Sequence, residues 1–204
     1  MTSEIQLWLR AKTYLQQSIE TKQRFADQCI EPILRAAAAI AESLNRGGKL
    51  LLCGNGGSAA DCQHISAEFV STLNHQCKRP GLKAIALTTD TSFLTAYAND
   101  FGFEGIFARQ VDTLGSPEDI LIGISTSGNS KNVIAAIEAA KKNHMLTIAL
   151  TGKGGRLVDL ADLVIAVPST TTSHIQESHI TVGHVLCDLV ECILFGETMR
   201  GLAN

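Results

Sequence analysis

Apolar residues recur three or four positions apart in the first quarter of the chain. Between residue 4 and about residue 27 the series is Ile5, Trp8, Ala11, Leu15 and Ile19. This spacing gathers side chains into one stripe along a helix. A second stripe follows Pro32, which suits the first turn of a helix, and it stops at Gly47 and Gly48, which suit a helix end. The pattern therefore predicts two helices within residues 1–47.

From Lys49 onward the pattern changes to short, continuous apolar runs that alternate with helical segments. The runs are Leu50–Cys53, Leu82–Leu87, Ile120–Ile124, Leu146–Leu150 and Leu163–Val167. Such runs are typical of strands buried on both faces, and their alternation with helices favours a parallel sheet with right-handed crossovers. We expect one α/β domain, a flavodoxin-like three-layer sandwich with a five-stranded parallel sheet over residues 48–204, preceded by the helical pair.

The last apolar segment, from Ile175 to about Phe195, is apolar around most of a helix circumference. A helix of this kind needs burial on several sides, and one small sheet can cover only one of them. We therefore expect this helix and the N-terminal pair to pack against other subunits.

Composition narrows the class of protein. The chain has 204 residues, 45% of them hydrophobic, and a formal net charge of −3 without a basic block, which argues against a nucleic-acid partner. The start of the chain has neither the basic residues nor the apolar core of an export signal, and the apolar runs are too short to span a bilayer. Six cysteines without a C-x-x-C pair suggest free buried thiols in a reducing compartment, so we expect a cytoplasmic protein.

A glycine-rich turn, Gly54–Asp61, follows the first predicted strand. Ser58 and Asp61 have the spacing of a capping pair, and the glycines let backbone N–H groups approach an anion at the helix start. The segment also fits G-x-G-x-x-A, a motif of dinucleotide-binding proteins that is followed by an acidic residue about 20 positions later. The candidate for that residue, Asp90, lies more than thirty positions later, which disfavours dinucleotide binding. A turn needed only for close packing of strand and helix is the remaining alternative.

A second polar loop, Ser125–Ser130, follows the predicted strand Ile120–Ile124. Its four hydroxyls and one glycine lie at a helix start, where neutral donors and the helix dipole can together hold phosphate. Ser130 as a simple helix cap would explain one hydroxyl and leave three unexplained. The loop therefore favours phosphate binding.

Two helices carry side chains that could perform chemistry. His64 and Glu68 lie four residues apart, on one face of the helix after the glycine turn. Such a pair can bind a divalent metal or supply a base, although a surface ion pair is the commoner outcome. His184 interrupts the apolar final helix, where the plain alternative is a histidine bonded to backbone.

Five segments occur together in one order and spacing: Cys53–Ser58, Asn99–Phe103, Gly123–Ser130, Leu150–Gly152 and Ile175–Glu177. In this they resemble the phosphoheptose isomerase family of the sugar isomerase (SIS) domain superfamily, and the resemblance covers nearly the whole chain. It implies conversion of sedoheptulose 7-phosphate to D-glycero-D-manno-heptose 7-phosphate, an early step towards the ADP-heptose of lipopolysaccharide. It also implies a homotetramer with active sites at subunit interfaces and one Zn²⁺ per subunit.

The resemblance assigns roles to particular residues. It implies an acid/base pair of Glu68 and His184, and zinc ligands at His64, Glu68, Gln176 and His184. Substrate contacts are implied at Asn55, Gly56, Gly57, Glu68, Asn99, Asp100, Ser125, Thr126, Ser127, Ser130 and Gln176. The chain is longer than some members between Glu68 and Arg79, so a substrate contact by Arg79 stays open.

The chemistry of isomerisation agrees with this assignment. Moving a proton between adjacent carbons through an enediol requires one group for the carbon proton and another for the oxygens, and Glu68 and His184 can fill these roles. Gln176 and His184 are about 12 Å apart along a helix axis, which is near the limit at which both could bind one metal ion. A site that draws its residues from two chains would remove this difficulty.

The main rival function is a non-catalytic SIS protein that binds a replication initiator, or a sugar phosphate as a regulator. Another rival is isomerisation of a hexose phosphate.

Overall fold

The computed structural model of the chain describes residues 2–73 and 78–196. Its centre is a five-stranded sheet in which all neighbouring strands run parallel, in the order β2-β1-β3-β4-β5. The strands are β1 (Leu50–Gly54), β2 (Ala84–Ala86), β3 (Ile120–Ser125), β4 (Leu146–Thr151) and β5 (Leu163–Ala166). This is the flavodoxin-like strand order, and it confirms the predicted fold class.

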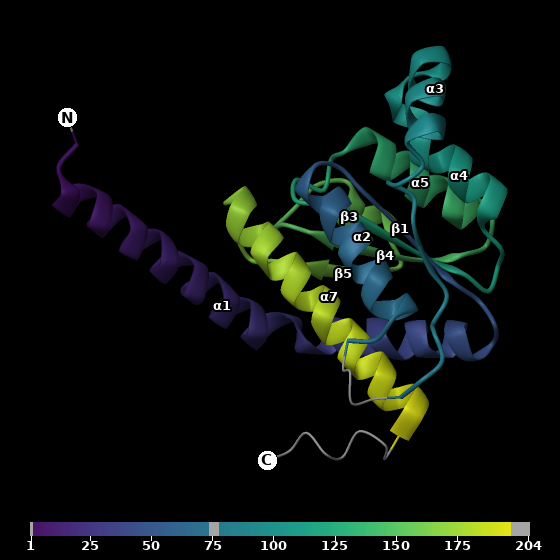
Figure 1. The fold of residues 1–204 in the computed structure, drawn as a ribbon, viewed down its shortest axis with the longest axis horizontal. Helices are drawn as coiled ribbons and strands as arrows, with labels where there is room; N and C mark the ends of the chain where they lie inside the picture. Colours follow the sequence, from purple (N-terminus) through teal and green to yellow (C-terminus); the bar gives the residue numbers. More distant parts are fainter. Residues whose placement is uncertain (1, 74–77, 197–204) are drawn as a thin grey trace.

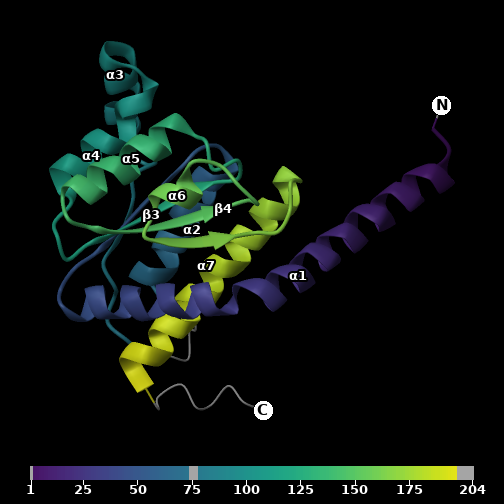
Figure 2. The same cartoon turned by 180° about the vertical axis from the view of Figure 1, so that it is seen from behind.

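Helices cover both faces of the sheet, which makes the three layers visible in Figures 1 and 2. One face packs against α1 (Glu4–Asn45), α2 (Gly57–Val70) and α7 (Thr172–Phe195). The other packs against α4 (Ile106–Leu114), α5 (Lys131–Lys142) and the short α6 (Leu157–Leu160). Alternate residues of β1 enter the two cores, Leu50 and Leu52 on the first face and Leu51 and Cys53 on the second, as strand geometry requires.

The expectation of two N-terminal helices is wrong, because α1 is one continuous helix of 42 residues that contains Pro32. Proline removes one backbone hydrogen bond and bends a helix, and α1 does change direction along its length (Figure 2). The segment after Pro32 buries Ile33, Ala37 and Ile40 against the sheet. That packing keeps the helix intact through the proline.

The first half of α1 extends away from the body of the protein (Figure 1). It carries large apolar side chains that are more than half exposed, at Ile5, Leu7, Trp8, Leu9, Leu15 and Ile19. A second projection is α3 (Thr91–Phe101), which has no buried residue and rises beyond α4 and α5. Both projections leave apolar surface that the protomer itself does not cover.

Helix α7 lies between α1 and α2 and is a core helix for much of its length. Within the described residues it is the one helix long and apolar enough to cross a membrane, a test that buried core helices also pass. Cys29, Cys53, Cys62 and Cys187 are free and buried, as the sequence analysis expects, whereas Cys192 is exposed. Cys77 lies outside the described residues.

Candidate active site

The polar loops identified in the sequence meet at the carboxyl edge of the sheet. The glycine loop follows β1 and the seryl loop follows β3, and these two strands are direct neighbours. Strand order reverses at this point, because β2 lies on one side of β1 and β3, β4 and β5 on the other. A crevice at the reversal is where open α/β sheets bind ligands.

The glycine loop opens α2 without the predicted capping pair. The helix begins at Gly57, its N-cap is Gly56, and no side chain caps it, so the assignment of Ser58 and Asp61 as a capping pair is wrong. Gly56 has a φ of 55°, a left-handed conformation that glycine adopts without strain. With no side-chain cap present, the first N–H groups of α2 are left for an anion.

The seryl loop gathers its hydroxyls as expected. Ser125 Oγ lies 2.9 Å from Ser130 Oγ and 3.4 Å from Ser127 Oγ. Ser130 occupies the N-cap position of α5, yet its side chain makes no cap hydrogen bond. The simple helix-cap interpretation therefore fails, and the hydroxyls form a cluster at the positive end of a helix.

One residue that the sequence analysis missed holds the two loops together. Asn132 is buried, and its amide group exchanges two hydrogen bonds of 2.8 Å with the amide of Asn55. The reciprocal pair fixes the glycine loop against the first turn of α5. A buried asparagine two residues after a hydroxyl-rich loop is a weak sequence signal, and its partner lies 77 residues away.

Helices α2 and α7 run side by side in the same direction. Gly57 contacts Gln176 near the start of both helices, and Gly183 contacts Ile65 further along. A Cβ at Gly183 would lie 2.5 Å from Ile65 Cγ1, so only glycine lets the helices approach this closely. The close approach brings His184 to the side of α2 that carries His64 and Glu68.

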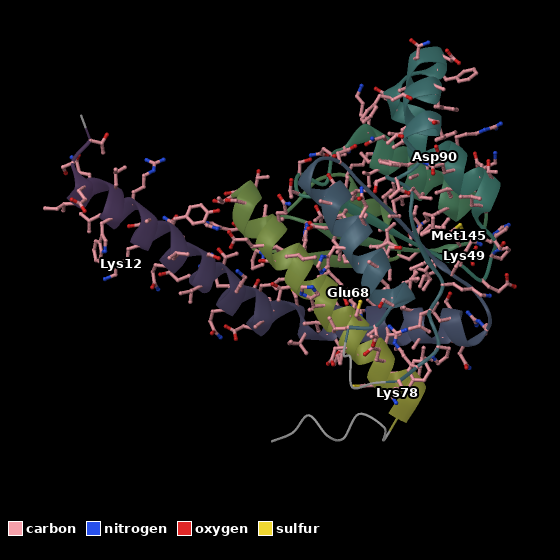
Figure 3. All side chains as sticks on the ribbon, in the orientation of Figure 1. Lys12, Lys49, Glu68, Lys78, Asp90 and Met145 are labelled. Carbon is pink, nitrogen blue, oxygen red and sulfur yellow. The ribbon has the colours of Figure 1, made fainter. Side chains whose placement is uncertain are left out.

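Three chemically active side chains converge at this helix contact. His64 Nε2 lies 3.0 Å from His184 Nε2 and 3.4 Å from Glu68 Oε1. One ligand atom from each of the three residues lies within 4.8 Å of the others. Figure 3 shows Glu68 where α2 and α7 meet. The structure therefore brings together a carboxylate and two imidazoles from distant parts of the chain.

The cluster has the donor set of a catalytic zinc site. Two histidines and one glutamate are a known three-residue ligand set for zinc that leaves further positions for water or substrate. Two ligands at zinc bond lengths and a tetrahedral angle are about 3.3 Å apart, close to the separations of 3.0 and 3.4 Å found here. The residues present therefore fit a zinc ion.

Other predicted site residues lie elsewhere in the protomer. The amide of Gln176 lies against Gly57, two helical turns before His184, so Gln176 borders the glycine loop. Asn99 and Asp100 are exposed on α3, where the Asn99 amide donates to Asp100 Oδ1 at 2.8 Å. Figure 1 shows α3 rising away from α7. The protomer alone does not bring these two residues to the cluster.

Arg79 is a buried structural residue and not an exposed group facing a ligand. Its side chain is 1% exposed, and its Nε donates to Glu191 Oε1 at 2.7 Å. Its guanidinium also donates to the backbone oxygens of Glu68, at 2.9 Å, and Phe69, at 3.0 Å. Arg79 thus connects the last turn of α2 to α7, and its hydrogen bond to the backbone oxygen of Glu68 helps to position that residue.

Two further titratable groups near the site have shifted pKa values. Burial raises the pKa of Asp61 to about 6, partly offset by nearby His64. Burial lowers the pKa of His179 to about 4, opposed by its 3.1 Å contact with the Thr151 carbonyl. His179 is therefore the backbone-bonded histidine of α7, whereas His184 belongs to the cluster.

Asp90, the acid considered for a dinucleotide, has a structural role. Its side chain accepts a 2.9 Å hydrogen bond from the Phe93 N–H and caps α3. Figure 3 places it at the base of α3, well away from Glu68. This placement agrees with the rejection of the dinucleotide interpretation.

Comparison with known proteins identifies the class that this fold and site define. A family model of the SIS domain matches residues 13–152, and the chain belongs to that family. A phosphoheptose isomerase from Roseiflexus sp. (strain RS-1) is 56% identical over 184 residues, which cover 90% of this chain and 92% of the relative. The chain is thus a member of the phosphoheptose isomerases, enzymes that isomerise a sugar phosphate.

Further relatives and solved structures agree. A phosphoheptose isomerase from Burkholderia pseudomallei (strain K96243) is 49% identical over 92% of this chain and 98% of its own. The structure of phosphoheptose isomerase GmhA from Neisseria gonorrhoeae matches with a TM-score of 0.85 and 44% identity, covering 91% of this chain and 98% of the other. The non-catalytic alternative is accordingly not favoured.

Proposed function

We propose that the enzyme converts sedoheptulose 7-phosphate to D-glycero-D-manno-heptose 7-phosphate by proton transfer through an enediol. The observation that carries the proposal is the convergence of Glu68, His64 and His184 beside the loops at the carboxyl edge. Proton transfer between neighbouring carbons needs a carboxylate or imidazole at the reacting end of the sugar. The phosphate group does not react, so its binding site should lie some distance from the reacting carbons.

The seryl loop supplies the anchor in this proposal. Hydroxyls of Ser125, Thr126, Ser127 and Ser130 donate to phosphate oxygens, and the N-terminus of α5 stabilises the negative charge. The Asn55–Asn132 pair holds the glycine loop at a fixed distance from them. Binding energy from the phosphate then orients the sugar chain for reaction at its other end.

Glu68 and His184 divide the proton transfers. Glu68 removes the proton from one carbon and returns it to the neighbouring carbon, while His184 moves the proton between the two oxygens and assists ring opening. Arg79 holds the backbone of Glu68, and the Gly183–Ile65 contact holds His184 beside it. Orientation of this kind is a large part of what a rigid site contributes to rate.

The ligand set proposed for Zn²⁺ is His64, Glu68, His184 and Gln176, one ion per subunit. Glu68 and His184 cannot bind the ion and accept a proton through the same atom at the same moment. When bound, zinc polarises a substrate oxygen and stabilises negative charge that develops on it. The contribution of Gln176 depends on its reaching the cluster, from which it lies about 12 Å along the helix axis in one protomer. Completion of each site at a subunit interface would resolve this distance, so we propose a homotetramer.

The exposed apolar half of α1 and the exposed α3 support that assembly, because both present surface for a second copy. In this arrangement Asn99 and Asp100 reach the substrate from a neighbouring subunit. We place the enzyme in the cytoplasm, in the supply of ADP-heptose for lipopolysaccharide.

The test is turnover of sedoheptulose 7-phosphate by the purified protein in deuterated water, followed by mass spectrometry of product and recovered substrate. Glu68→Gln and His184→Ala should each lower kcat by about 100- to 10,000-fold. They should also abolish deuterium uptake at carbon 2 of the product and at carbon 1 of the recovered substrate. Glu42→Gln, an exposed carboxylate of α1, is the matched control. Unchanged turnover in both site variants would refute the catalytic assignment, and turnover only of hexose phosphates would refute the substrate.

Metal removal is checked separately on the same preparation. Chelator should lower turnover, and zinc should restore it. His64→Ala should bind less zinc per protomer by elemental analysis, because it removes one of the three clustered ligands. Full activity in metal-free protein would exclude a catalytic zinc.

A further inference from the structure

A cavity of about 340 Å³ lies apart from the isomerase site, between α1 and the loops that follow β4 and β5. Its lining includes Thr21 and Arg24 of α1, Lys153 after β4, Ser169 and Thr170 after β5, and His174 of α7. None of the residues assigned to the isomerase site lines this cavity.

Donors and positive charge dominate the lining. Arg24 keeps free donors, because among the described residues its guanidinium makes a single hydrogen bond, of 3.2 Å, from Nη2 to Thr21 Oγ1. The Lys153 ammonium has no hydrogen-bond or ion-pair partner among residues 2–73 and 78–196. The acidic residue of the lining is Glu20, which accepts from Gln16. Helix α7, 24 residues long, begins here and adds the positive end of its dipole.

His174 is a buried polar side chain that lines this cavity. The side chain is 3% exposed, and neither ring nitrogen has a hydrogen-bond partner in the described part of the chain. Tyr14 packs on the ring at a centroid distance of 4.6 Å. The nearby Glu177 carboxylate lies 3.8 Å from Nδ1 and is engaged by Tyr14, Ser18 and Lys22. Both ring nitrogens of this buried imidazole therefore lack a hydrogen bond in the described part of the chain, and a ligand in the cavity could supply one.

The cavity also adjoins the seryl loop. A neighbouring cavity of about 330 Å³ shares Lys153, Ser169 and Thr170 with it, and its lining includes Thr126 and Ser127. A ligand held by His174 and Arg24 would therefore lie in the cavity next to the one that borders the phosphate anchor of the isomerase site.

We propose that this cavity is a second oxyanion site, which binds the phosphate group of a small molecule or inorganic phosphate. A phosphate offers acceptor oxygens in several directions, which matches donors that come from α1, two loops and α7. His174 donates one hydrogen bond, Arg24 and Lys153 supply charge, and the hydroxyls of Ser169 and Thr170 complete the shell. The site is separate from the proposed seryl-loop anchor and does not depend on the reaction catalysed.

The experiment isolates this site from the seryl loop. The full-length protein carries Ser125→Ala and Ser127→Ala, so that the anchor loses two hydroxyls, and its histidines are labelled with ¹³C at Cε1. Inorganic phosphate is titrated at constant ionic strength and the histidine resonances are followed by NMR. One resonance should move, and that resonance should be absent from His174→Phe, which keeps the ring packing against Tyr14.

Arg24→Met in the same background should raise the phosphate concentration at half-saturation by about tenfold, the effect of losing one charge-assisted hydrogen bond. Arg10→Met, on the projecting half of α1, should leave it unchanged. A sugar phosphate titrated in parallel distinguishes a phosphorylated metabolite, which binds more tightly, from free phosphate.

Two results would overturn the proposal. In the first, no resonance assigned to His174 moves, or it moves equally in Arg24→Met. In the second, phosphate has no effect while Arg24→Met dissociates the protein into smaller species by light scattering, so that the cavity is a contact between subunits. Circular dichroism confirms that each variant is folded, and activity is not the measured quantity.

Discussion

His179 and His184 lie five residues apart on α7 and have opposite surroundings. His184 is partly exposed in the three-residue cluster, whereas His179 is fully buried beneath the Thr151 carbonyl. Burial penalises the charged imidazolium, so the pKa of His179 falls from 6.5 to about 4. His179 therefore stays neutral throughout the range in which an ordinary histidine titrates.

This shift predicts part of the pH dependence of stability. Between pH 6.5 and pH 4 the unfolded chain binds a proton at His179 that the folded protein does not, so the free energy of unfolding falls as the pH falls. The loss is at most about 3 kcal/mol, from about 1.4 kcal/mol per pKa unit. Urea unfolding at pH 7 and pH 4 should show a smaller loss in His179→Gln than in wild type. Exposed His144, changed to Gln, is the control, and equal losses in wild type and His179→Gln would contradict the assignment.

At the scale of elements, the site depends on how closely α2 and α7 approach. Gly183→Ala would place a Cβ 2.5 Å from Ile65 Cγ1 and push the helices apart. We expect a loss of about 1–3 kcal/mol in the free energy of unfolding, as overpacking usually causes. We also expect a lower kcat, because His184 would move away from Glu68.

A second substitution separates crowding from other effects. Ile65→Val in the Gly183→Ala background should recover part of both losses, because it removes Cδ1, one of the two atoms that crowd the new methyl group. Gly154→Ala is the control, since a Cβ there has nothing within 4 Å. Failure of Ile65→Val to improve either quantity would show that the helix approach is not what Gly183 provides.

The buried Arg79–Glu191 pair is the second link between these helices. Arg79→Ala leaves Glu191, itself 0% exposed, without its cationic partner. Removing one partner of a buried ion pair costs about 3–5 kcal/mol. The double variant Arg79→Met with Glu191→Leu should be more stable than Arg79→Ala in urea unfolding.

The kcat of this double variant should stay below that of wild type while KM changes little, because the backbone of Glu68 has lost its guanidinium donor. Wild-type kcat in the double variant would remove the positioning role.

At the scale of the whole molecule, the projecting half of α1 carries a row of exposed apolar side chains. Leu15 and Ile19, one helical turn apart, are 63% and 62% exposed. Changing both to Lys should shift the protein towards smaller species in light-scattering measurements, because a charge replaces apolar surface in the proposed subunit contact. Gln16→Lys is the control on the same stretch. An unchanged mass in the double variant would place the contact elsewhere.

The sequence was informative where a regular pattern decides structure. Five apolar runs became five parallel strands, because a strand buried on both faces needs such a run. Local rules failed where distant packing decides. Pro32 did not break α1, because Ile33, Ala37 and Ile40 are buried against the sheet. Ser58 does not cap α2, because the helix begins at Gly57 with Gly56 as its N-cap.

The candidate site likewise has features that the local sequence predicts and features that depend on distant residues. The two anion loops were identifiable from their own residues, because glycine and hydroxyls at a helix start have a local meaning. The meeting of His64 with His184 rested on resemblance, since 120 residues separate them and each had a plain structural alternative. The Asn55–Asn132 pair could not be predicted, because neither residue carries a sign of its partner.

Three helices, α2, α5 and α7, begin beyond the carboxyl ends of β1, β3 and β5 and therefore start at the same rim of the molecule. Each contributes roughly half a positive charge there, although the whole chain is acidic with a net charge of −3. A doubly charged phosphate ester is thus repelled by the protein at long range and drawn to this rim at short range. The rate of encounter then varies with ionic strength in two opposing ways, since added salt weakens both the general repulsion and the local attraction.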